Sequence, residues 1–333
     1  MTATQASALR VLVTGATGML GRSLCQQLVG PEFELMGTAL RRADGKVIMR
    51  VDLTSEAEVV AVMDTFKPDV VINCAAERDP DTAAKDEART RMLNVDSPKM
   101  LAMLCAQRGS ALIQLSTDYV FDGGVFTKSF PPYDVDAPTH PLNLYAVTKR
   151  DSETVVLACK GARALVLRVP VLYAVDCATV SESASLSVAK SLLSKEVSKV
   201  DNWGVRFPTL VDDVASVIVD LVRLKGRGPG RAPGTHDPAT GILHCSSPYH
   251  VSKYELVKLM GRILDVNTEH LLPDDEAPKG EPRPKMTQLN CDRTWSVIGR
   301  TQKFTSLEDG MRRALRKFGE EIKRAPGAAD AKL

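Results

Sequence analysis

The sequence has no CxxC pair, no long apolar run and no excess of charge of either sign. Its seven cysteines are scattered and odd in number, which is typical of a reducing compartment. The apolar stretch over residues 164–175 is broken by Arg168 and Pro170, and residues 1–10 lack the apolar core of a signal peptide. We therefore predict a cytoplasmic protein with no membrane partner.

Charge and histidine usage exclude two further classes. The 43 basic and 41 acidic residues give a net charge of +2, which is too even for a protein whose main partner is nucleic acid. The five histidines show no metal-ligand spacing, and we predict no metal site. With 44% hydrophobic and 25% charged residues, the 333-residue chain is an ordinary globular sequence, of a length that suits one large domain or a large domain with a smaller partner.

Short β-branched runs alternate with helix-period segments in the first half of the chain. This alternation predicts a parallel sheet with helices on both faces, that is, a Rossmann-type, doubly wound α/β fold. After Val169 the rhythm loosens, and we expect a smaller, mainly C-terminal α/β lobe. The predicted strands cover residues 11–14, 33–39, 46–53, 69–74, 111–116 and 164–169, and the clearest helical segments cover 19–28, 55–66 (with a capping box of Ser55 and Glu58) and 82–108.

A glycine-rich turn follows the first strand and opens the first helix. In such a turn one glycine allows a tight bend, another lets backbone N–H groups approach a pyrophosphate, and a third lets helix pack on strand. The helix N-terminus then faces the anion. A purely structural turn is the alternative, but the strand, turn and helix context favours dinucleotide binding by Gly15, Thr17, Gly18, Met19, Leu20 and Gly21.

The end of the second strand indicates which dinucleotide binds. NAD sites place an acid there for the ribose 2′-hydroxyl, whereas this strand ends in Arg41 and Arg42, with no acid until Asp44. Guanidinium groups pair with a 2′-phosphate, so NADP(H) is favoured, although solvated loop arginines are the alternative. Asp52 and Leu53, at the end of the third strand, form the expected edge for the adenine.

Tyr145 and Lys149 lie four residues apart, on one face of a predicted helix. We expect the cation to favour phenolate, lowering the Tyr145 pKa and making the phenol a usable acid or base. A hydroxyl in the segment 116–123, at the carboxyl end of the fifth strand, can hold a substrate carbonyl beside the nicotinamide. The same spacing recurs in Tyr249 with Lys253 and in Tyr254 with Lys258, which lie beyond a glycine-rich loop and are predicted to be surface pairs.

These motifs resemble those of the extended short-chain dehydrogenase/reductase superfamily, over residues 10–315. Within it, the chain is similar to the group that joins dTDP-4-dehydrorhamnose reductase to the regulatory β subunit of methionine adenosyltransferase. The resemblance implies a triad of Thr117, Tyr145 and Lys149, with Tyr145 as general acid and Lys149 also on the nicotinamide ribose. It further implies Asn94 as support for the lysine, and Cys74, Ala75 and Ala76 as lining of the cofactor. On the substrate side it implies Asp118, Tyr119 and Arg283, the last alternatively a structural loop residue.

Two functions stay open within this group. Segments 74–81, 168–173, 206–209 and 253–255 look closer to the β subunit, and Val171 stands where rhamnose-forming reductases carry a base-stacking tryptophan. The intact triad points instead to an NADPH-dependent reductase of a 4-keto nucleotide sugar, although the same residues also bind cofactor. The partner is accordingly a methionine adenosyltransferase catalytic subunit or a nucleotide-sugar substrate, and a homo-oligomer stays open.

The cofactor and substrate assignments define the expected domains. Residues 9–170 form the NADP-binding domain, with about 207–225 packing back on it. Residues 171–206 and 240–305 form the substrate-side lobe. Residues 225–241 are expected to be a flexible loop, and 326–333 a disordered tail.

Overall fold

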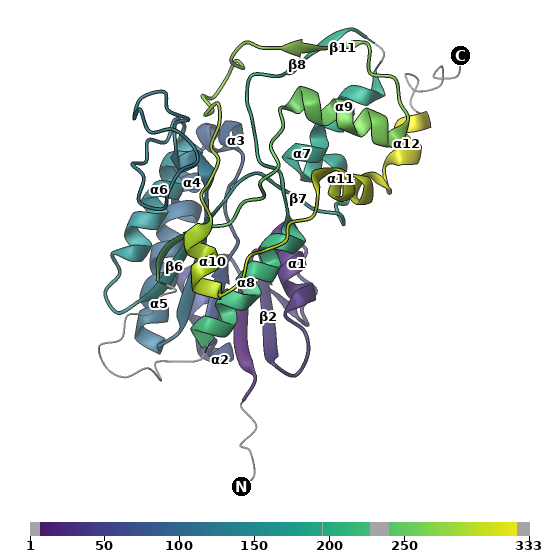
Figure 1. The fold of residues 1–333 in the computed structure, drawn as a ribbon. Helices are drawn as coiled ribbons and strands as arrows, with labels where there is room; N and C mark the ends of the chain where they lie inside the picture. Colours follow the sequence, from purple (N-terminus) through teal and green to yellow (C-terminus); the bar gives the residue numbers. More distant parts are fainter. Residues whose placement is uncertain (1–6, 195, 227–239, 325–333) are drawn as a thin grey trace.

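A parallel sheet forms the centre of the molecule. The computed structural model describes residues 7–194, 196–226 and 240–324, and within them this sheet has seven strands in the order β10-β6-β5-β4-β1-β2-β3. Every neighbouring pair is parallel, which confirms the Rossmann-type fold (Figure 1). The strands are β1 (Leu9–Thr14), β2 (Phe33–Ala39), β3 (Ile48–Arg50), β4 (Val70–Asn73), β5 (Ala111–Thr117), β6 (Arg163–Val169) and β10 (Gly241–His244).

Helices cover both faces of this sheet because successive strand residues point to opposite sides. Val11 and Val13 of β1 join one hydrophobic cluster with helices α1 (Met19–Gln27) and α8 (Val211–Gly226). Leu12 joins the other, which contains residues of α2, α5 and α6. These three helices span Glu56–Phe66, Ser97–Arg108 and Leu144–Leu157.

The predicted helix over 82–108 is in fact broken. It consists of α3 (Pro80–Lys85), α4 (Glu87–Arg91), a π-helical turn η1 (Met92–Asp96) and α5. Asp86 leaves the helical conformation, and its carboxylate accepts from the Arg89 N–H at 3.0 Å, so it starts a new helix. The capping box at α2 is also only half formed, because Ser55 accepts from the Glu58 N–H while the Glu58 carboxylate accepts from the Asp52 N–H.

The remaining elements gather mainly beyond the carboxyl ends of the strands. Figure 1 shows α7, α9 and α11 at the end of the molecule away from the N-terminus. Two short parallel pairs join distant segments, β7 with β9 and β8 with β11. The elements are η2 (Asp118–Val120), β7 (Leu172–Tyr173), η3 (Val180–Glu182), α7 (Ala184–Ser187), η4 (Val188–Leu193), β8 (Ser198–Asp201), β9 (Thr209–Leu210), α9 (Lys253–Leu264), β11 (Leu271–Asp274), α10 (Asp292–Ile298), α11 (Leu307–Leu315) and α12 (Gly319–Arg324).

Two elements differ from the predicted lobe range 240–305. β10 pairs with β6 as an edge strand of the central sheet, and α10 packs on β10 and α8. β10 pairs with β6 in register from Gly241 to His244, and this pairing buries Leu243 fully. The predicted tail at 326–333 and most of the predicted loop at 225–241 lie outside the described residues.

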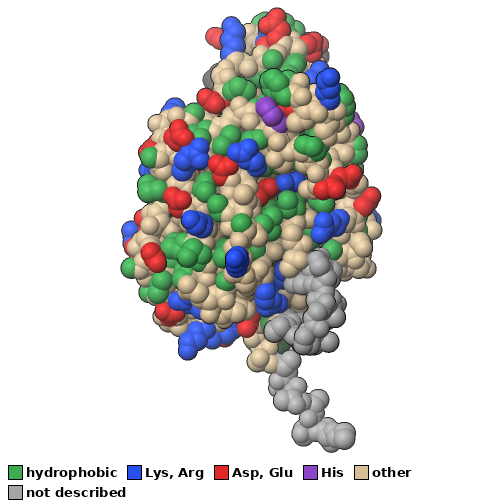
Figure 2. All heavy atoms as spheres, turned by 90° about the vertical axis from the view of Figure 1, so that its left-hand side faces the viewer, with side chains coloured by type: hydrophobic (Ala, Val, Ile, Leu, Met, Phe, Trp, Pro, Cys, Tyr) green, Lys and Arg blue, Asp and Glu red, His purple; other side chains and the backbone are tan. Residues whose placement is uncertain are grey.

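Charged side chains of both signs are interspersed on the face that Figure 2 draws, as the small net charge predicts. Among the described helices, none combines the length and the apolar character that crossing a membrane requires.

Candidate functional site

The glycine-rich turn between β1 and α1 is shaped by close backbone approach. Gly15 has a left-handed φ of +64°, and a Cβ there would lie 2.9 Å from the Ala75 N atom. A Cβ on Gly21 would lie 2.3 Å from the Gly15 carbonyl oxygen. Gly18 caps α1 with no side-chain hydrogen bond and no acid in the first turn, so the first N–H groups of the helix suit an anionic ligand.

The other cofactor residues predicted at this edge surround the same turn. Met19 and Leu20 are buried at the start of α1, and the Cys74 N–H donates to the Thr14 carbonyl at 3.3 Å where β4 ends. Burial raises the pKa of the Cys74 thiol. Ala75 and Ala76 follow, and Ala75 is the residue against which the Gly15 turn packs. The two predicted stretches therefore meet where β1 and β4 end.

Arg42 reaches the glycine turn from the end of β2. Its φ is 61°, and its guanidinium donates to the Thr17 carbonyl at 2.8 Å. Arg41 is exposed, and its carbonyl accepts from the Thr17 hydroxyl at 3.3 Å. Asp44 is engaged in its own turn, where one carboxylate oxygen accepts from the N–H groups of residues 46–48. The end of β2 thus offers a cation beside the cradle, and Asp44, the first acid after β2 in the sequence, is bonded within its own turn.

The predicted adenine edge follows β3. The Asp52 carboxylate accepts from the N–H and the hydroxyl of Thr54 at 2.9 and 2.7 Å, and these bonds lower its pKa. Leu53 is buried, and its carbonyl accepts from the Ser97 hydroxyl at 2.8 Å. The edge is therefore fixed by hydrogen bonds to its own loop and to α5.

The Tyr145 hydroxyl of α6 lies close to the Thr117 hydroxyl at the end of β5. Burial around the Tyr145 hydroxyl raises its pKa, and the nearby Thr117 hydroxyl offsets this only in part. The prediction that Lys149 lowers this pKa was wrong, because the Lys149 ammonium donates to the Leu115 carbonyl at 2.6 Å instead. The phenol is therefore protonated at neutral pH, as a proton donor must be.

Lys149 is itself buried, which lowers its pKa to about 8, while the nearby Glu153 carboxylate opposes that shift. Asn94 lies in the π-helical turn and is fully buried. Its side chain binds both backbone groups of Glu77, at 2.8 and 2.9 Å, and donates to the Thr148 hydroxyl at 3.1 Å. Asn94 thus ties the loop after β4 to the helix that carries Tyr145 and Lys149.

Asp118 and Tyr119 lie beside Tyr145. Asp118 is buried and accepts from the hydroxyls of Thr117 and Thr287, yet burial dominates and raises its pKa to about 6. The Tyr119 ring meets the Tyr145 ring edge to face at 6.3 Å, and its hydroxyl accepts from the Arg206 Nε at 3.2 Å. These groups form a polar wall next to the phenol.

Arg283, the third predicted substrate residue, is committed to a partner across the molecule. Its guanidinium donates to the Asp81 carboxylate of α3 at 2.7 Å. That ion pair joins the loop between β11 and α10, which carries Arg283, to α3.

A buried ionic cluster beneath the site escaped sequence reasoning. Arg168 of β6 holds the Glu153 carboxylate through two bonds of 2.7 and 2.9 Å, and Glu153 also accepts from the Ser116 hydroxyl. The Arg168 Nη1 lies 3.3 Å from His244 Nε2, and burial lowers the His244 pKa to about 3. A charged residue inside an apolar strand was the signal that could have revealed this pairing.

A second missed group lies at the glycine turn. Arg22 of α1 donates to the Asp176 carboxylate at 2.8 Å, to Glu182 at 2.7 Å and to the Thr17 carbonyl at 2.9 Å. Arg78, after β4, donates to the Glu182 carbonyl at 2.6 Å. No local pattern links Arg22 to Asp176 and Glu182, because these acids lie more than 150 residues further along the chain.

The other two tyrosine and lysine pairs with the same spacing, Tyr249 with Lys253 and Tyr254 with Lys258, lie apart from these residues. Tyr249 is exposed and precedes α9 rather than lying on it. Tyr254 is on α9, where the Lys258 ammonium lies 5.9 Å from its ring centroid. Among the described residues, no group of three or more His, Cys, Asp or Glu side chains could hold a metal ion.

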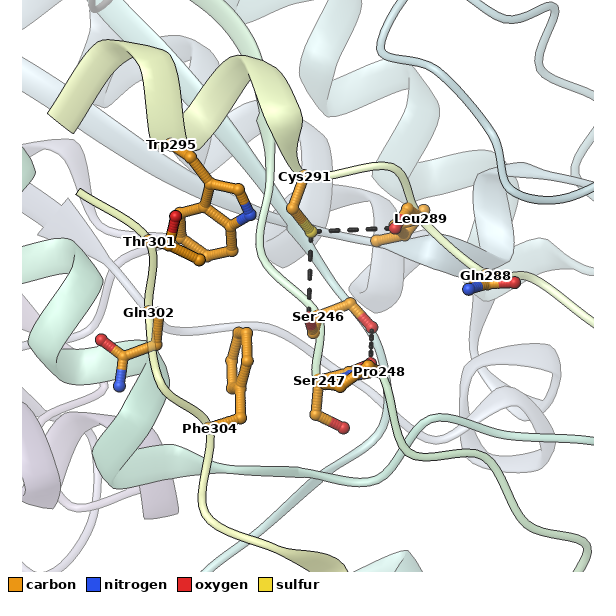
Figure 3. Close-up of a pocket in the computed structure, with 10 residues that line it drawn as sticks. All are labelled: Ser246, Ser247, Pro248, Gln288, Leu289, Cys291, Trp295, Thr301, Gln302 and Phe304. Atoms are coloured by element: carbon orange, nitrogen blue, oxygen red, sulfur yellow. Dashed lines mark hydrogen bonds between the residues drawn. The ribbon is translucent and has the colours of Figure 1, made fainter. Parts of the chain in front are cut away.

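A cavity of about 260 Å³ lies beyond the end of β10. Figure 3 shows Trp295 of α10 and Phe304 on one side and the 246–248 segment on the other, with the Cys291 thiol directed at the Ser246 and Leu289 carbonyls. Its ten described lining residues include none of those predicted for cofactor or substrate. It is therefore separate from the candidate site.

Proteins of known identity are similar in sequence to this chain over most of its length. Methionine adenosyltransferase 2 subunit beta from Xenopus laevis is 38% identical over 286 residues, which is 85% of this chain and 81% of that relative. A probable dTDP-4,6-dihydroxy-2-methyloxan-3-one 4-ketoreductase from Streptomyces antibioticus is 33% identical over 300 residues, 87% of this chain and 90% of its own length.

Among solved structures, the dTDP-4-dehydrorhamnose reductase from Bacillus anthracis in complex with NADP has the same fold. It superimposes with a TM-score of 0.73 at 24% identity, covering 94% of this chain and all of that one. The model of the RmlD substrate binding domain matches residues 9–318. Because this match spans nearly the whole chain, the protein belongs to the RmlD substrate binding domain family.

Proposed function

We propose that this chain binds NADP(H) where β1, β2 and β4 end. The observation that carries the proposal is the glycine turn, where a side chain on Gly15 or Gly21 would collide with backbone and the N–H groups of α1 carry no side-chain cap. In this proposal the α1 N-terminus holds the pyrophosphate, Arg41 and Arg42 hold the 2′-phosphate, and Asp52 with Leu53 borders the adenine.

We further propose that the cofactor-loaded protein is a regulatory β subunit of methionine adenosyltransferase. The support is the 38% identity to such a subunit over 85% of this chain, against 33% to the ketoreductase. In this function Tyr145 and Lys149 serve to bind the cofactor, and the partner is the catalytic subunit. The proposed location is the cytoplasm. Residues 9–170 remain the proposed cofactor domain, and 171–206 with the rest of the distal segments the proposed partner or substrate side.

One observation favours a second function, reduction of a 4-keto nucleotide sugar. Tyr145 keeps its proton and lies close to the Thr117 hydroxyl and beside Asp118 and Tyr119. When bound, NADPH supplies the hydride for such a reduction. The protein's own part would be to orient the ketone oxygen between Thr117 and Tyr145 and to deliver the Tyr145 proton to that oxygen.

Two measurements on the same preparation separate these functions. The first follows NADPH oxidation with dTDP-4-dehydrorhamnose for the unaltered chain, for Tyr145→Phe, and for Tyr249→Phe as a control outside the site. The second measures co-purification with a methionine adenosyltransferase catalytic subunit and the rate of S-adenosylmethionine synthesis. Turnover that is lost only in Tyr145→Phe would refute a purely regulatory role. A stable complex with altered synthesis and no NADPH oxidation would refute the reductase.

The choice of cofactor has its own test. The double variant Arg41→Ala and Arg42→Ala should weaken NADP⁺ binding far more than NAD⁺ binding, because only NADP⁺ carries the 2′-phosphate. Isothermal titration calorimetry measures both affinities. Equal losses for the two nucleotides would show that the end of β2 does not hold the phosphate.

A further inference from the structure

One residue of the distal part of the chain gathers three arginines at the proposed cofactor edge. The Glu182 carboxylate accepts from Arg22 at 2.7 Å and lies 3.6 Å from the Arg42 guanidinium. Its backbone carbonyl accepts from Arg78 at 2.6 Å. The three arginines follow β1, β2 and β4, so Glu182 lies where those strand ends converge.

The two carboxylate contacts differ in strength. Arg22 is held closely, by Glu182 and by a two-bond pair with Asp176 at 2.8 and 3.1 Å. Arg42 is 61% exposed, and its 3.6 Å separation from Glu182 is longer than a hydrogen bond. Its firm bond is to the Thr17 carbonyl. The Glu182 to Arg42 contact is therefore the one that an incoming anion can replace.

The Glu182 carboxylate is held in place by the fold. Only 15% of the Glu182 side chain is exposed, and its second oxygen accepts from the Ala178 N–H at 2.9 Å. With two arginines and this N–H around it, Glu182 has a pKa below its usual range, although burial opposes the shift. A fixed negative charge thus lies beside the cation expected to receive a phosphate.

We propose that Glu182 sets how strongly this site prefers a 2′-phosphorylated cofactor, by competing with the 2′-phosphate for Arg42 and repelling it. The inference rests on the proposed binding of NADP(H). A phosphate dianion forms shorter, charge-assisted bonds to a guanidinium than a carboxylate 3.6 Å away, so it replaces Glu182 at Arg42. The remaining negative charge of Glu182 then weakens NADP⁺ binding. NAD⁺ has no 2′-phosphate and is affected less.

The test compares Glu182→Gln with the unaltered chain by isothermal titration calorimetry with NADP⁺, NAD⁺ and adenosine 2′,5′-bisphosphate. Glutamine keeps one acceptor oxygen, for Arg22, and loses the acceptor for the Ala178 N–H, so thermal unfolding of the variant checks that the fold is retained. The ratio of NADP⁺ to NAD⁺ affinity should rise about two- to five-fold, the effect of one partly exposed charge pair. The bisphosphate, which carries the same 2′-phosphate without a nicotinamide, should bind more tightly by the same factor.

Three further variants assign the effect to Arg42. Glu308→Gln removes an exposed acid paired with Arg312 at 2.8 Å and should leave the ratio unchanged. Asp176→Asn loosens Arg22 and should shift both nucleotides together. In an Arg42→Ala background, Glu182→Gln should no longer change the ratio.

The outcomes separate this inference from the proposed function. If the unaltered chain binds neither nucleotide, the proposed cofactor function fails and this inference fails with it. If the unaltered chain binds NADP⁺ but Glu182→Gln leaves the ratio as it was, only the role of Glu182 is overturned. A change that persists without Arg42 would also overturn it, because the carboxylate would then act through another group.

Discussion

Replacing Gly15 with alanine tests whether the glycine turn is shaped by close approach or only by backbone conformation. Gly15 and Gly109 have similar left-handed φ angles, +64° and +73°, so alanine at either position meets the same intrinsic strain of about 1–2 kcal/mol. Only Gly15 faces backbone, since a Cβ there would lie 2.9 Å from the Ala75 N atom and 3.0 Å from the Cys74 carbonyl carbon. A Cβ on Gly109 meets nothing within 4 Å.

The two variants should therefore differ by the overpacking at Gly15 alone. Forcing a methyl group into a filled site costs about 1–3 kcal/mol, so Gly15→Ala should lose about 2–5 kcal/mol of unfolding free energy and Gly109→Ala about 1–2 kcal/mol. Urea unfolding measures both losses. Because the collision moves the turn, Gly15→Ala should also bind NADP⁺ at least tenfold more weakly, whereas Gly109→Ala should bind it normally.

Equal losses of stability in the two variants would refute this reasoning. So would unchanged NADP⁺ affinity in a folded Gly15→Ala protein. The first result would mean that the strand ends of β1 and β4 yield to the methyl group, and the second that the turn does not hold the pyrophosphate.

Three other predictions concern the buried groups beneath the site. Glu153→Gln leaves the Arg168 charge buried and unpaired and should cost about 3–5 kcal/mol in urea unfolding, against less than about 0.5 kcal/mol for the exposed Glu308→Gln. Lys149 loses its proton above about pH 8 in the folded protein but only near pH 10.5 in the unfolded chain. Between pH 8 and 10 the unfolding free energy of the unaltered chain should therefore rise by about 2–3 kcal/mol relative to that of Lys149→Met. A difference that stays constant with pH would contradict the burial of Lys149. His244 should stay neutral from pH 8 to 5 in NMR titrations, with its contribution to stability lost as pH falls from 6.5 towards 3, and a titration midpoint above 5 would exclude its buried contacts.

The parts of the fold that sequence predicted are those set by local pattern. The runs at β1, β2 and β5 are mostly apolar, and the glycine turn follows β1 directly, so each could be recognised without its neighbours. The break at Asp86 was missed because a capping aspartate inside a helical pattern looks like an exposed helix residue until its carboxylate turns to the Arg89 N–H.

Contacts between distant segments could not be predicted in the same way. The spacing of Tyr145 and Lys149 is visible in the sequence, but the direction of the lysine is not. Its ammonium turns to the Leu115 carbonyl of β5, which lies 34 residues earlier in the chain. The sign predicted for the Tyr145 pKa failed for this reason, since burial acts on the phenol and Lys149 does not offset it.

The position of Lys149 also bears on why a regulatory protein would keep a tyrosine and lysine pair. The ammonium satisfies a buried carbonyl of β5, and one helical turn further along α6 its counter-charge Glu153 is fixed by Arg168 of β6. Replacing Lys149 would leave that carbonyl unpaired and Glu153 with one cation fewer, so the lysine is held in place by the fold whether or not a ketone is reduced. No such constraint holds the hydroxyl of Tyr145, which lies close to the Thr117 hydroxyl. The Tyr145→Phe variant therefore separates chemistry from structure, and a change at Lys149 would not.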